Sequence, residues 1–573
     1  MPKFHFTRAA VLSLACGLAA ATAWASAPPV SFVQSAGSLS EVQRRAAPVP
    51  DIEAARVQDT AKERTGTLGP YRFAIKSTVD YSLENSGSWT TLEDGSRLWR
   101  LRVDSAGAKS LSLTFDRFLL PEGAFLWVYS GNTQQVLGPY TSRNAKNDRL
   151  WTPILAGESA IVELHEPAEA FERSEVVITG VAHGYRGFFD RSSTKQGSCN
   201  NDVICPEADP WRDQVRSIVA YSLNGTDRCT GILINNAAQD GRPLVLTAEH
   251  CNIGGGYPDP SFYFNFESPV CGALSGGSMD QSINGATLLA INEISDFALL
   301  EMDARPPAAF NAFYAGWDAS DAPLPNGVIS IHHPSVDEKA ISFENDPVLT
   351  SADTDIWPST HWRVNDWDDG TTERGSSGSP IFDRLGRVVG TLSGGFAACG
   401  NDEPDWYGKM AEHYNRGLQT FLDPAGTTQT LAGIDASETG GGDDGGGGDG
   451  GGDPDPSVCT ESDTVRCLSG GRFEVRVSWR DFENNSGAAR SGSTSPDSSV
   501  WWFFGPDNWE LLVKVLDACD SDGHYWVFAG AASNVEFTLT VTDTLSGEER
   551  VYQNELGVSS MAFTDTSAFA TCG

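Results

Sequence analysis

Residues 243–251 read Pro-Leu-Val-Leu-Thr-Ala-Glu-His-Cys, a short apolar run followed by a histidine and a cysteine. Such a run predicts a buried strand, so His250 would stand at the end of that strand. A lone histidine is more often structural than catalytic, and this one therefore needs partners. Cys229 opens Cys-Thr-Gly-Ile-Leu-Ile, and a bridge from it to Cys251 would pin the histidine strand to a neighbouring strand.

Two further segments supply what a histidine needs to activate an alcohol. Asp296 precedes the apolar run Phe-Ala-Leu-Leu, where a carboxylate could orient the imidazole. Ser377 lies in Gly-Ser-Ser-Gly-Ser-Pro at 375–380, where glycines on both sides permit a sharp turn that exposes the hydroxyl. The N–H groups of Gly375 and Ser377 would then face a developing oxyanion. The chain order His250, Asp296, Ser377 predicts a catalytic triad with an oxyanion hole.

Motifs around these residues resemble the lysyl endopeptidase family of bacterial trypsin-like serine proteases. They are Ser198-Cys199-Asn-Asn-Asp-Val-Ile-Cys205-Pro-Glu, Tyr221-Ser222, Cys229-Thr-Gly, Ile331-His332-His333-Pro334 and Gly375-Ser-Ser-Gly-Ser-Pro380. The match covers residues 194–430 and includes all six cysteines there. The resemblance implies two six-stranded antiparallel β-barrels with the site between them. It also implies the disulfides Cys199–Cys399, Cys205–Cys271 and Cys229–Cys251.

The resemblance also places a specificity pocket. Asp405, in Pro-Asp-Trp-Tyr-Gly at 404–408, matches the pocket aspartate of the family. A carboxylate in a pocket selects a cationic side chain, because a buried unpaired charge is costly. The preference for Lys over Arg comes from the family alone, so cleavage after Lys is predicted and cleavage after Arg stays open. Ser393, Gly394 and Gly395 would form the edge that pairs with the substrate backbone.

Two positions depart from the family. Ser393 stands where the family has a histidine that stacks on a tryptophan, matched here by Trp367. A serine cannot stack, so the pH range and the fine preference for Lys are left open. Glu249 stands where the common motif has a small residue or a histidine. Its carboxylate would favour the protonated form of His250 and shift activity to higher pH.

The sequence predicts an all-β protein of several domains, preceded by an export signal. Residues 1–25 form a signal peptide, with Lys3 and Arg8 before an apolar run and small residues at the cleavage positions. We therefore expect secretion through bacterial export. Residues 26–65, rich in Ala, Pro and mixed charge, predict a poorly ordered lead-in with room for one short helix. Residues 66–193 alternate apolar and polar side chains, which predicts a β-sandwich propeptide domain.

The protease domain, residues 194–437, is followed by two more segments. Glycines and aspartates at 438–456 predict a flexible linker. Residues 457–573 alternate again and predict a small C-terminal β-sandwich. Its four cysteines predict two bridges whose pairing the sequence leaves open: Cys459, Cys467, Cys519 and Cys572.

A self-processing precursor is predicted from two observations. Animal trypsins carry an aspartate before the catalytic serine, which pairs with the newly cut N-terminus, but Ser376 occupies that position here. The family's mature enzyme starts a few residues before its first cysteine. Lys195, four residues before Cys199, fits that boundary and is also the residue that the enzyme itself would select. We therefore predict self-cleavage after Lys195.

Composition narrows the partners. A net charge of −36 and a pI near 4.5 argue against nucleic acid or an anionic membrane as the main partner. Of the 11 cysteines, Cys16 lies in the export signal, and an even set in an exported chain favours disulfides over metal. We expect polypeptide substrates, no metal, no cofactor and no membrane span, and the partner of the C-terminal domain is unknown. The alternatives are a catalytically silent adhesion protein and a protease of this fold with another specificity.

Overall fold

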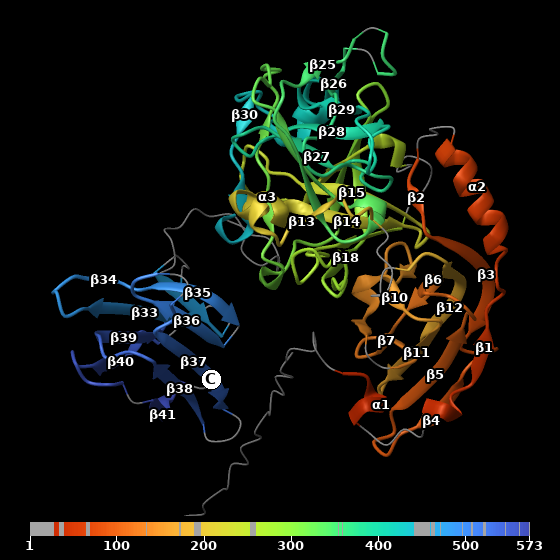
Figure 1. Cartoon of the computed structure of the whole chain (residues 1–573). Helices are drawn as coiled ribbons and strands as arrows, with labels where there is room; N and C mark the ends of the chain where they lie inside the picture. Colours follow the sequence, from red (N-terminus) through yellow and green to blue (C-terminus); the bar gives the residue numbers. More distant parts are fainter. Residues whose placement is uncertain are drawn as a thin grey trace, which may run out of the picture. The chain divides into compact units, whose positions relative to one another are not determined.

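The protein is seen as a computed structural model that is all-β (Figure 1). It describes residues 28–33, 39–64, 69–132, 135–170, 173–187, 196–251, 259–352, 354–357, 359–439, 459, 464–469, 472–495, 497–505, 508–519, 523–544, 546–560 and 562–571. The predicted signal peptide, Lys195 and residues 440–456 of the predicted linker lie outside these ranges. The chain divides after residue 444 into two compact units. No helix in the described ranges has the length and apolar character needed to cross a bilayer.

An N-terminal sandwich of two sheets encloses its own apolar core. The first sheet comprises β1 (Arg44–Ala46), β4 (Ser88–Thr91), β5 (Arg97–Asp104), β7 (Phe125–Ser130), β8 (Val136–Tyr140) and β11 (Ser159–Glu166). The second comprises β3 (Ala74–Ser82), β6 (Ser110–Leu119), β9 (Leu150–Trp151), β10 (Leu155–Ala156) and β12 (Glu175–Gly184). Leu111, Leu113 and Phe115 of β6 all point into this core, as their alternation predicts.

The lead-in at 26–65 is more ordered than the sequence predicts. Alongside α1 (Val30–Val33) it holds the 13-residue helix α2 (Ile52–Arg64). Its strand β1 pairs in parallel with β5 and so belongs to the sandwich. The composition did not reveal this order because the stabilising contacts come from distant residues. Asp59 of α2, for example, accepts from the guanidinium groups of Arg72 and Arg186.

Two larger sheets form the double barrel that the resemblance implies. The first comprises β14 (Ile218–Leu223), β15 (Asp227–Leu233), β16 (Leu244–Thr247), β17 (Pro260–Tyr263), β18 (Ser282–Asn284), β19 (Ala286–Asn292), β20 (Phe297–Met302) and β2 (Tyr71–Arg72). The second comprises β13 (Asn201–Asp202), β22 (Trp317–Asp318), β23 (Val328–His332), β24 (Ala340–Glu344), β25 (Leu349–Thr350), β26 (His361–Val364), β27 (Pro380–Phe382), β28 (Val388–Gly395), β29 (Asp405–Lys409) and β30 (Thr430–Leu431). Helices α3 (Arg212–Ser217), α4 (Met410–His413) and α5 (Gln419–Leu422), and the pair β21 (Phe313–Tyr314) and β31 (Ile434–Asp435), complete this region.

The strand count departs from two sets of six. The first sheet gains β2, which pairs with the first two residues of β15, and the second gains short strands such as β25 and β30. The sandwich and the barrels also share a closed apolar cluster. Phe73, Ala74, Ile154 and Ala182 pack there against Ala220, Tyr263, Phe266 and Met279, all almost fully buried. The guanidinium of Arg149 adds two 3.0 Å hydrogen bonds to the Asp259 carboxylate.

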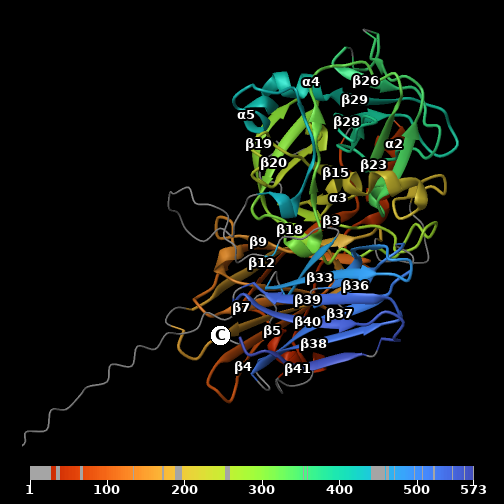
Figure 2. The same cartoon turned by 90° about the vertical axis from the view of Figure 1, so that its left-hand side faces the viewer.

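The C-terminal unit is a second sandwich with its own core (Figure 2). One sheet holds β32 (Val465–Leu468), β33 (Phe473–Arg480), β34 (Ser486–Ala488), β39 (Glu536–Asp543) and β40 (Glu548–Asn554). The other holds β35 (Arg490–Ser495), β36 (Ser498–Trp502), β37 (Leu511–Ala518), β38 (His524–Ala531) and β41 (Phe563–Phe569). Cys459 bridges to Cys467, and Cys519 is also disulfide-bonded. Cys572 lies outside the described residues.

Candidate active site

His250 and Asp296 meet where two paired strands end. β16 runs antiparallel to β20, with Thr247 opposite Ala298, so the residues after β16 lie beside those before β20. His250 follows on a short 3₁₀ turn, and Asp296 adopts the left-handed conformation, with φ of 57°, which an aspartate tolerates. Its carboxylate accepts from His250 twice, from Nδ1 at 2.8 Å and from the main-chain N–H at 2.9 Å. This pairing fixes the ring and leaves Nε2 directed away from Asp296.

The environment of Asp296 keeps it ionised. Burial alone would raise its pKa, but the charge of His250 and hydrogen bonds from His250 and Ser393 outweigh that effect. The pKa of Asp296 therefore lies below its ordinary value, and a carboxylate faces the imidazole at neutral pH.

The turn that carries Ser377 packs against the same strands. The Ser377 carbonyl accepts from the main-chain N–H of Thr230 in β15, at 2.9 Å. Gly378 has φ of 81°, and a Cβ there would lie 2.8 Å from the Ala248 nitrogen, two residues before His250. Only glycine permits this approach, so the turn is held beside the end of β16. The half-buried Ser377 thus lies next to the turn that carries His250.

The two predicted oxyanion donors are unengaged. Gly375, with φ of 101°, shapes the turn, and its carbonyl accepts from the Thr230 hydroxyl at 2.9 Å. Within the described residues, neither the Gly375 N–H nor the Ser377 N–H donates a hydrogen bond. Both can therefore bind an acceptor that arrives at this turn.

Asp405 is a buried carboxylate held by neutral groups. It begins β29, opposite Gly395 of β28, and is 1% exposed. Its Oδ2 accepts from the Thr372 hydroxyl at 2.6 Å and from the indole N–H of Trp367 at 2.9 Å. Burial raises the pKa of Asp405 to about 6, and no charged side chain is among the causes of that shift. A cation that reached this carboxylate would offset the free-energy cost of burying its negative charge.

The end of β28 presents an open strand edge next to Asp405. Gly394 and Gly395 pair with β29 on one side, while the pairing of β28 with β27 extends no further than Thr391 within the described chain. A Cβ at residue 395 would lie only 1.9 Å from Asp405 Oδ1. The side chain of Ser393 does not face this edge. It is buried and bonded to His361 Nε2 at 2.9 Å.

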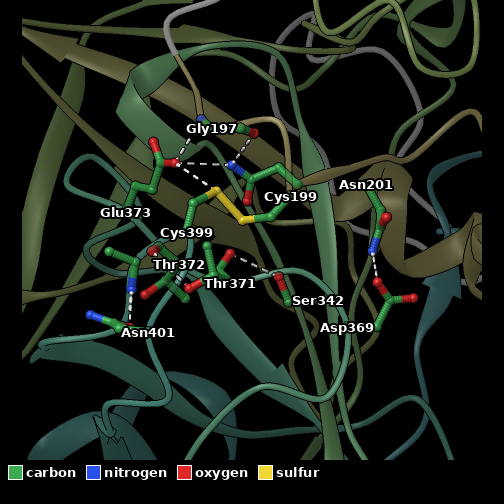
Figure 3. Close-up of a disulfide and its surroundings, with 12 residues drawn as sticks. Gly197, Cys199, Asn201, Ser342, Asp369, Thr371, Thr372, Glu373, Cys399 and Asn401 are labelled. Carbon is green, nitrogen blue, oxygen red and sulfur yellow. Dashed lines mark hydrogen bonds between the residues drawn. A yellow bond between two sulfur atoms is a disulfide. The ribbon is translucent and has the colours of Figure 1, made fainter.

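The chain that follows Lys195 is anchored at the base of the Ser377 turn. Figure 3 shows Glu373 accepting from the Gly197 main chain, at 2.7 Å, beside the Cys199–Cys399 disulfide. The Ser376 hydroxyl, which replaces the aspartate of animal trypsins, is bonded instead to His332 Nδ1 at 2.8 Å. Cys205–Cys271 and Cys229–Cys251 complete the three disulfides of this region, the same pairs that the resemblance implies.

Sequence reasoning missed three residues of this neighbourhood. Trp367 was matched only as a stacking partner, yet it donates to Asp405 and meets Tyr407 edge-on. Thr372, the other donor, stands five residues before Ser377 in a polar run that carries no distinctive pattern. His361 opens a strand that nothing in the sequence connects to Asp296. Only the pairing of distant strands brings these side chains to the site.

Glu249 supplies a pH test. Its pKa is raised, first by partial burial and then by the nearby carboxylates Asp296 and Glu293. A carboxylate beside an imidazole favours the protonated form of the ring, and this is the effect that the sequence predicts for Glu249. Glu249→Gln is therefore expected to move the acid limb of the kcat/KM profile to lower pH by about 0.3 to 0.5 units. An unchanged limb, measured from pH 5 to 9 on a peptide substrate, would refute the effect.

Comparisons with known proteins show what the chain is similar to. Residues 43–184 match the family model "Lysyl endopeptidase N-terminal domain", and residues 193–408 match "Lysyl endopeptidase, C-terminal domain". A relative named Lysyl endopeptidase, from Pseudomonas aeruginosa, is 28% identical over 345 residues, which cover 54% of this chain and 72% of that protein. Among solved structures, that of a Glu endopeptidase in complex with MPD aligns with a TM-score of 0.27 and 17% identity, over 36% of this chain and 89% of that one.

Proposed function

This chain belongs to the lysyl endopeptidase family of serine proteases, and we propose that it is a secreted precursor that cuts polypeptides after Lys. The observation that carries the specificity is the buried Asp405, whose hydrogen-bond partners Trp367 and Thr372 are neutral. A cationic side chain compensates such a carboxylate, and the choice of Lys over Arg comes from the family. Arg remains the alternative, since a guanidinium carries the same charge.

In the proposed reaction, three side chains and two amides divide the work. The Ser377 hydroxyl attacks the scissile carbonyl while His250 Nε2 takes its proton, and the His250 Nδ1–H stays bonded to Asp296. The N–H groups of Gly375 and Ser377 hold the oxyanion. His250 then gives the proton to the leaving amine, which departs and leaves an acyl-enzyme. Water attacks this ester while His250 takes a proton from it, and His250 then returns that proton to the Ser377 oxygen as the acid product leaves.

The open strand edge at Gly394 and Gly395 supports a binding mode in which the substrate main chain pairs with the end of β28. A substrate strand that adds to β28 would run past Asp405 as it leaves the edge. Glycine at 395 leaves the approach to Asp405 clear, because any Cβ there would meet the carboxylate. We propose main-chain pairing with residues 393–395, and a role for Ser393 on the opposite side, toward Asp296.

A digest of a denatured protein tests the specificity. Mass spectrometry of the fragments should show Lys before nearly every cut, with Arg at a lower frequency. Cuts that mostly follow Leu or Phe would contradict the role of Asp405. Labelling of Ser377 by a fluorophosphonate, lost in Ser377→Ala, separates an active enzyme from a silent adhesion protein.

We also propose that maturation separates the sandwich at 66–193 from the protease domain at 194–437 by cleavage after Lys195. Two contacts of the following residues support this boundary. Gln196 N donates to Asp337 Oδ2 at 3.3 Å, and Gly197 N donates to Glu373, so the chain is packed into the protease domain from residue 196 onward. Export follows from the predicted signal at 1–25, and the disulfides fit an oxidising compartment.

A further inference from the structure

A second histidine stands behind the Asp296 carboxylate. His361 opens β26 and lies opposite Gly408 of β29. A Cβ on Gly408 would meet the carbonyl oxygen of Ser295 at 2.1 Å, so β29 is pressed directly against the turn that carries Asp296. The imidazole of His361 is fully buried and stacks on Trp357, with ring centroids 5.6 Å apart. Packing therefore fixes this ring close to the proposed catalytic carboxylate.

The link between His361 and Asp296 is Ser393, which sits at an irregularity in β28. The pairing of β28 with β29 shifts register between Leu392 and Gly394. Such a bulge re-aims the residue it leaves out of the ladder, here Ser393. Its hydroxyl lies 2.9 Å from His361 Nε2, and its interaction with Asp296 is among the causes that lower the pKa of that carboxylate.

The direction of these hydrogen bonds follows from the proton count. A hydroxyl has one proton, so if Ser393 donates to the Asp296 carboxylate it must accept from His361. That requires the proton of His361 to be on Nε2. Nδ1 must then accept, and the Thr360 hydroxyl lies 2.8 Å away as donor, closer to Nδ1 than to the Ile294 carbonyl, which is 3.4 Å from the same hydroxyl. One chain of donors thus runs from Thr360 through His361 and Ser393 to Asp296.

The ring can keep this tautomer because it stays neutral. Burial lowers the pKa of His361 to about 4, with Lys409 acting in the same direction and the charge of Asp296 opposing it. His413, also buried, is another neighbour, and burial lowers its pKa to about 3. Around Asp296 itself, the charged or titratable neighbours are His250, Glu249, Tyr221, His361 and His413. Through the working pH range, His361 therefore acts as a fixed dipole.

We propose that His361 is a positioning residue, which holds the Ser393 hydroxyl in the orientation that donates to Asp296 and so sets how strongly Asp296 attracts the proton of His250. The proposal rests on the proposed triad. Without the His361 donor, Ser393 turns away for part of the time and the negative charge of Asp296 becomes more concentrated. The protonated form of His250 is then favoured, and a higher pH is needed to reach the neutral, active form.

Two substitutions at position 361 separate the hydrogen bond from the packing. His361→Phe keeps a ring on Trp357 but removes the donor, and it should lower kcat for a Lys peptide about tenfold, with KM little changed. The acid limb of kcat/KM should move up by about 0.5 pH units. His361→Gln places an amide N–H near Nε2 and should restore most of both values. A limb that stays in place in His361→Phe overturns the proposal.

A double-mutant cycle with Ser393→Ala tests the route. If His361 acts through Ser393, adding His361→Phe to Ser393→Ala should change neither kcat nor the acid limb further, whereas additive losses would contradict the route. His413→Gln is the matched control, because His413 is equally buried near Asp296 but is bonded to Thr391. A shift there as large as in His361→Phe would also count against the proposal. Wild-type enzyme that fails to react with a fluorophosphonate would instead sink the proposed function.

Discussion

Replacing Ser377 with Ala is expected to lower kcat for a Lys peptide by about 10⁶-fold, because the proposed nucleophile is lost while the binding edge and oxyanion donors remain. The same variant should accumulate as a precursor uncut after Lys195. Both results follow from one hydroxyl on a turn held against Thr230 and Ala248. Peptide turnover, and N-terminal sequencing of the purified chain, measure them.

Two controls make this result specific. Ser379→Ala changes a fully buried serine of the same motif and should mature and turn over substrate within a few fold of wild type. Adding wild-type enzyme to the Ser377→Ala precursor should cut it after Lys195, which separates an inactive enzyme from an inaccessible site. If the Ser377→Ala precursor matures when expressed and purified alone, the self-processing proposal is wrong.

Asp405→Asn is expected to lower kcat/KM for Lys substrates by about 10²- to 10³-fold, because the substrate ammonium would be buried without a counter-charge. Turnover of a matched Leu peptide should change little, which distinguishes a lost pocket charge from a damaged active site. Equal losses on both peptides would contradict the assignment. Asp402→Asn, at an exposed aspartate of the same loop, should leave both rates unchanged.

The same substitution is expected to stabilise the fold at neutral pH. Burial raises the pKa of Asp405 to about 6, from its ordinary value of 3.8. The unfolded chain therefore loses this proton first, and the folded state is progressively disfavoured as pH rises from about 4 to 6. Above that range the cost is about 3 kcal/mol. In a Ser377→Ala background, Asp405→Asn should raise Tm at pH 8 much more than at pH 4, as thermal melts will show.

The features that could be predicted from the sequence are those set by residues close together along the chain. His250 and Ser377 sit in distinctive local motifs, at a strand end and between glycines, whereas Asp296 before a strand is a weak signal alone and was chosen with the protease family in view. The structure brings the three segments together. Asp405 required a family comparison, because an Asp after Pro in a turn is usually structural. The alternation of apolar and polar side chains predicted both sandwiches for a similar local reason, since it is visible within each strand.

What the sequence did not predict depends on contacts across the fold. The helix α2 has an unremarkable composition, and its Asp59 finds Arg72 and Arg186 only after folding. The shared core of the sandwich and barrels joins side chains about 200 residues apart, such as Phe73 and Phe266. The sequence did not predict that a shift in strand register turns the Ser393 side chain toward Asp296, because no composition rule signals such a shift.

The bare backbone at position 395 has an evolutionary corollary. Since one methyl group there would collide with the Asp405 carboxylate, a single nucleotide change from a glycine to an alanine codon is expected to weaken the proposed recognition of basic residues and to leave the catalytic groups in place. Gene copies that keep Gly395 and Asp405 should retain the ancestral cleavage specificity, whereas copies altered at either position should show a different specificity. The codons for residues 395 and 405 would then group paralogues by the peptide bonds that they cleave.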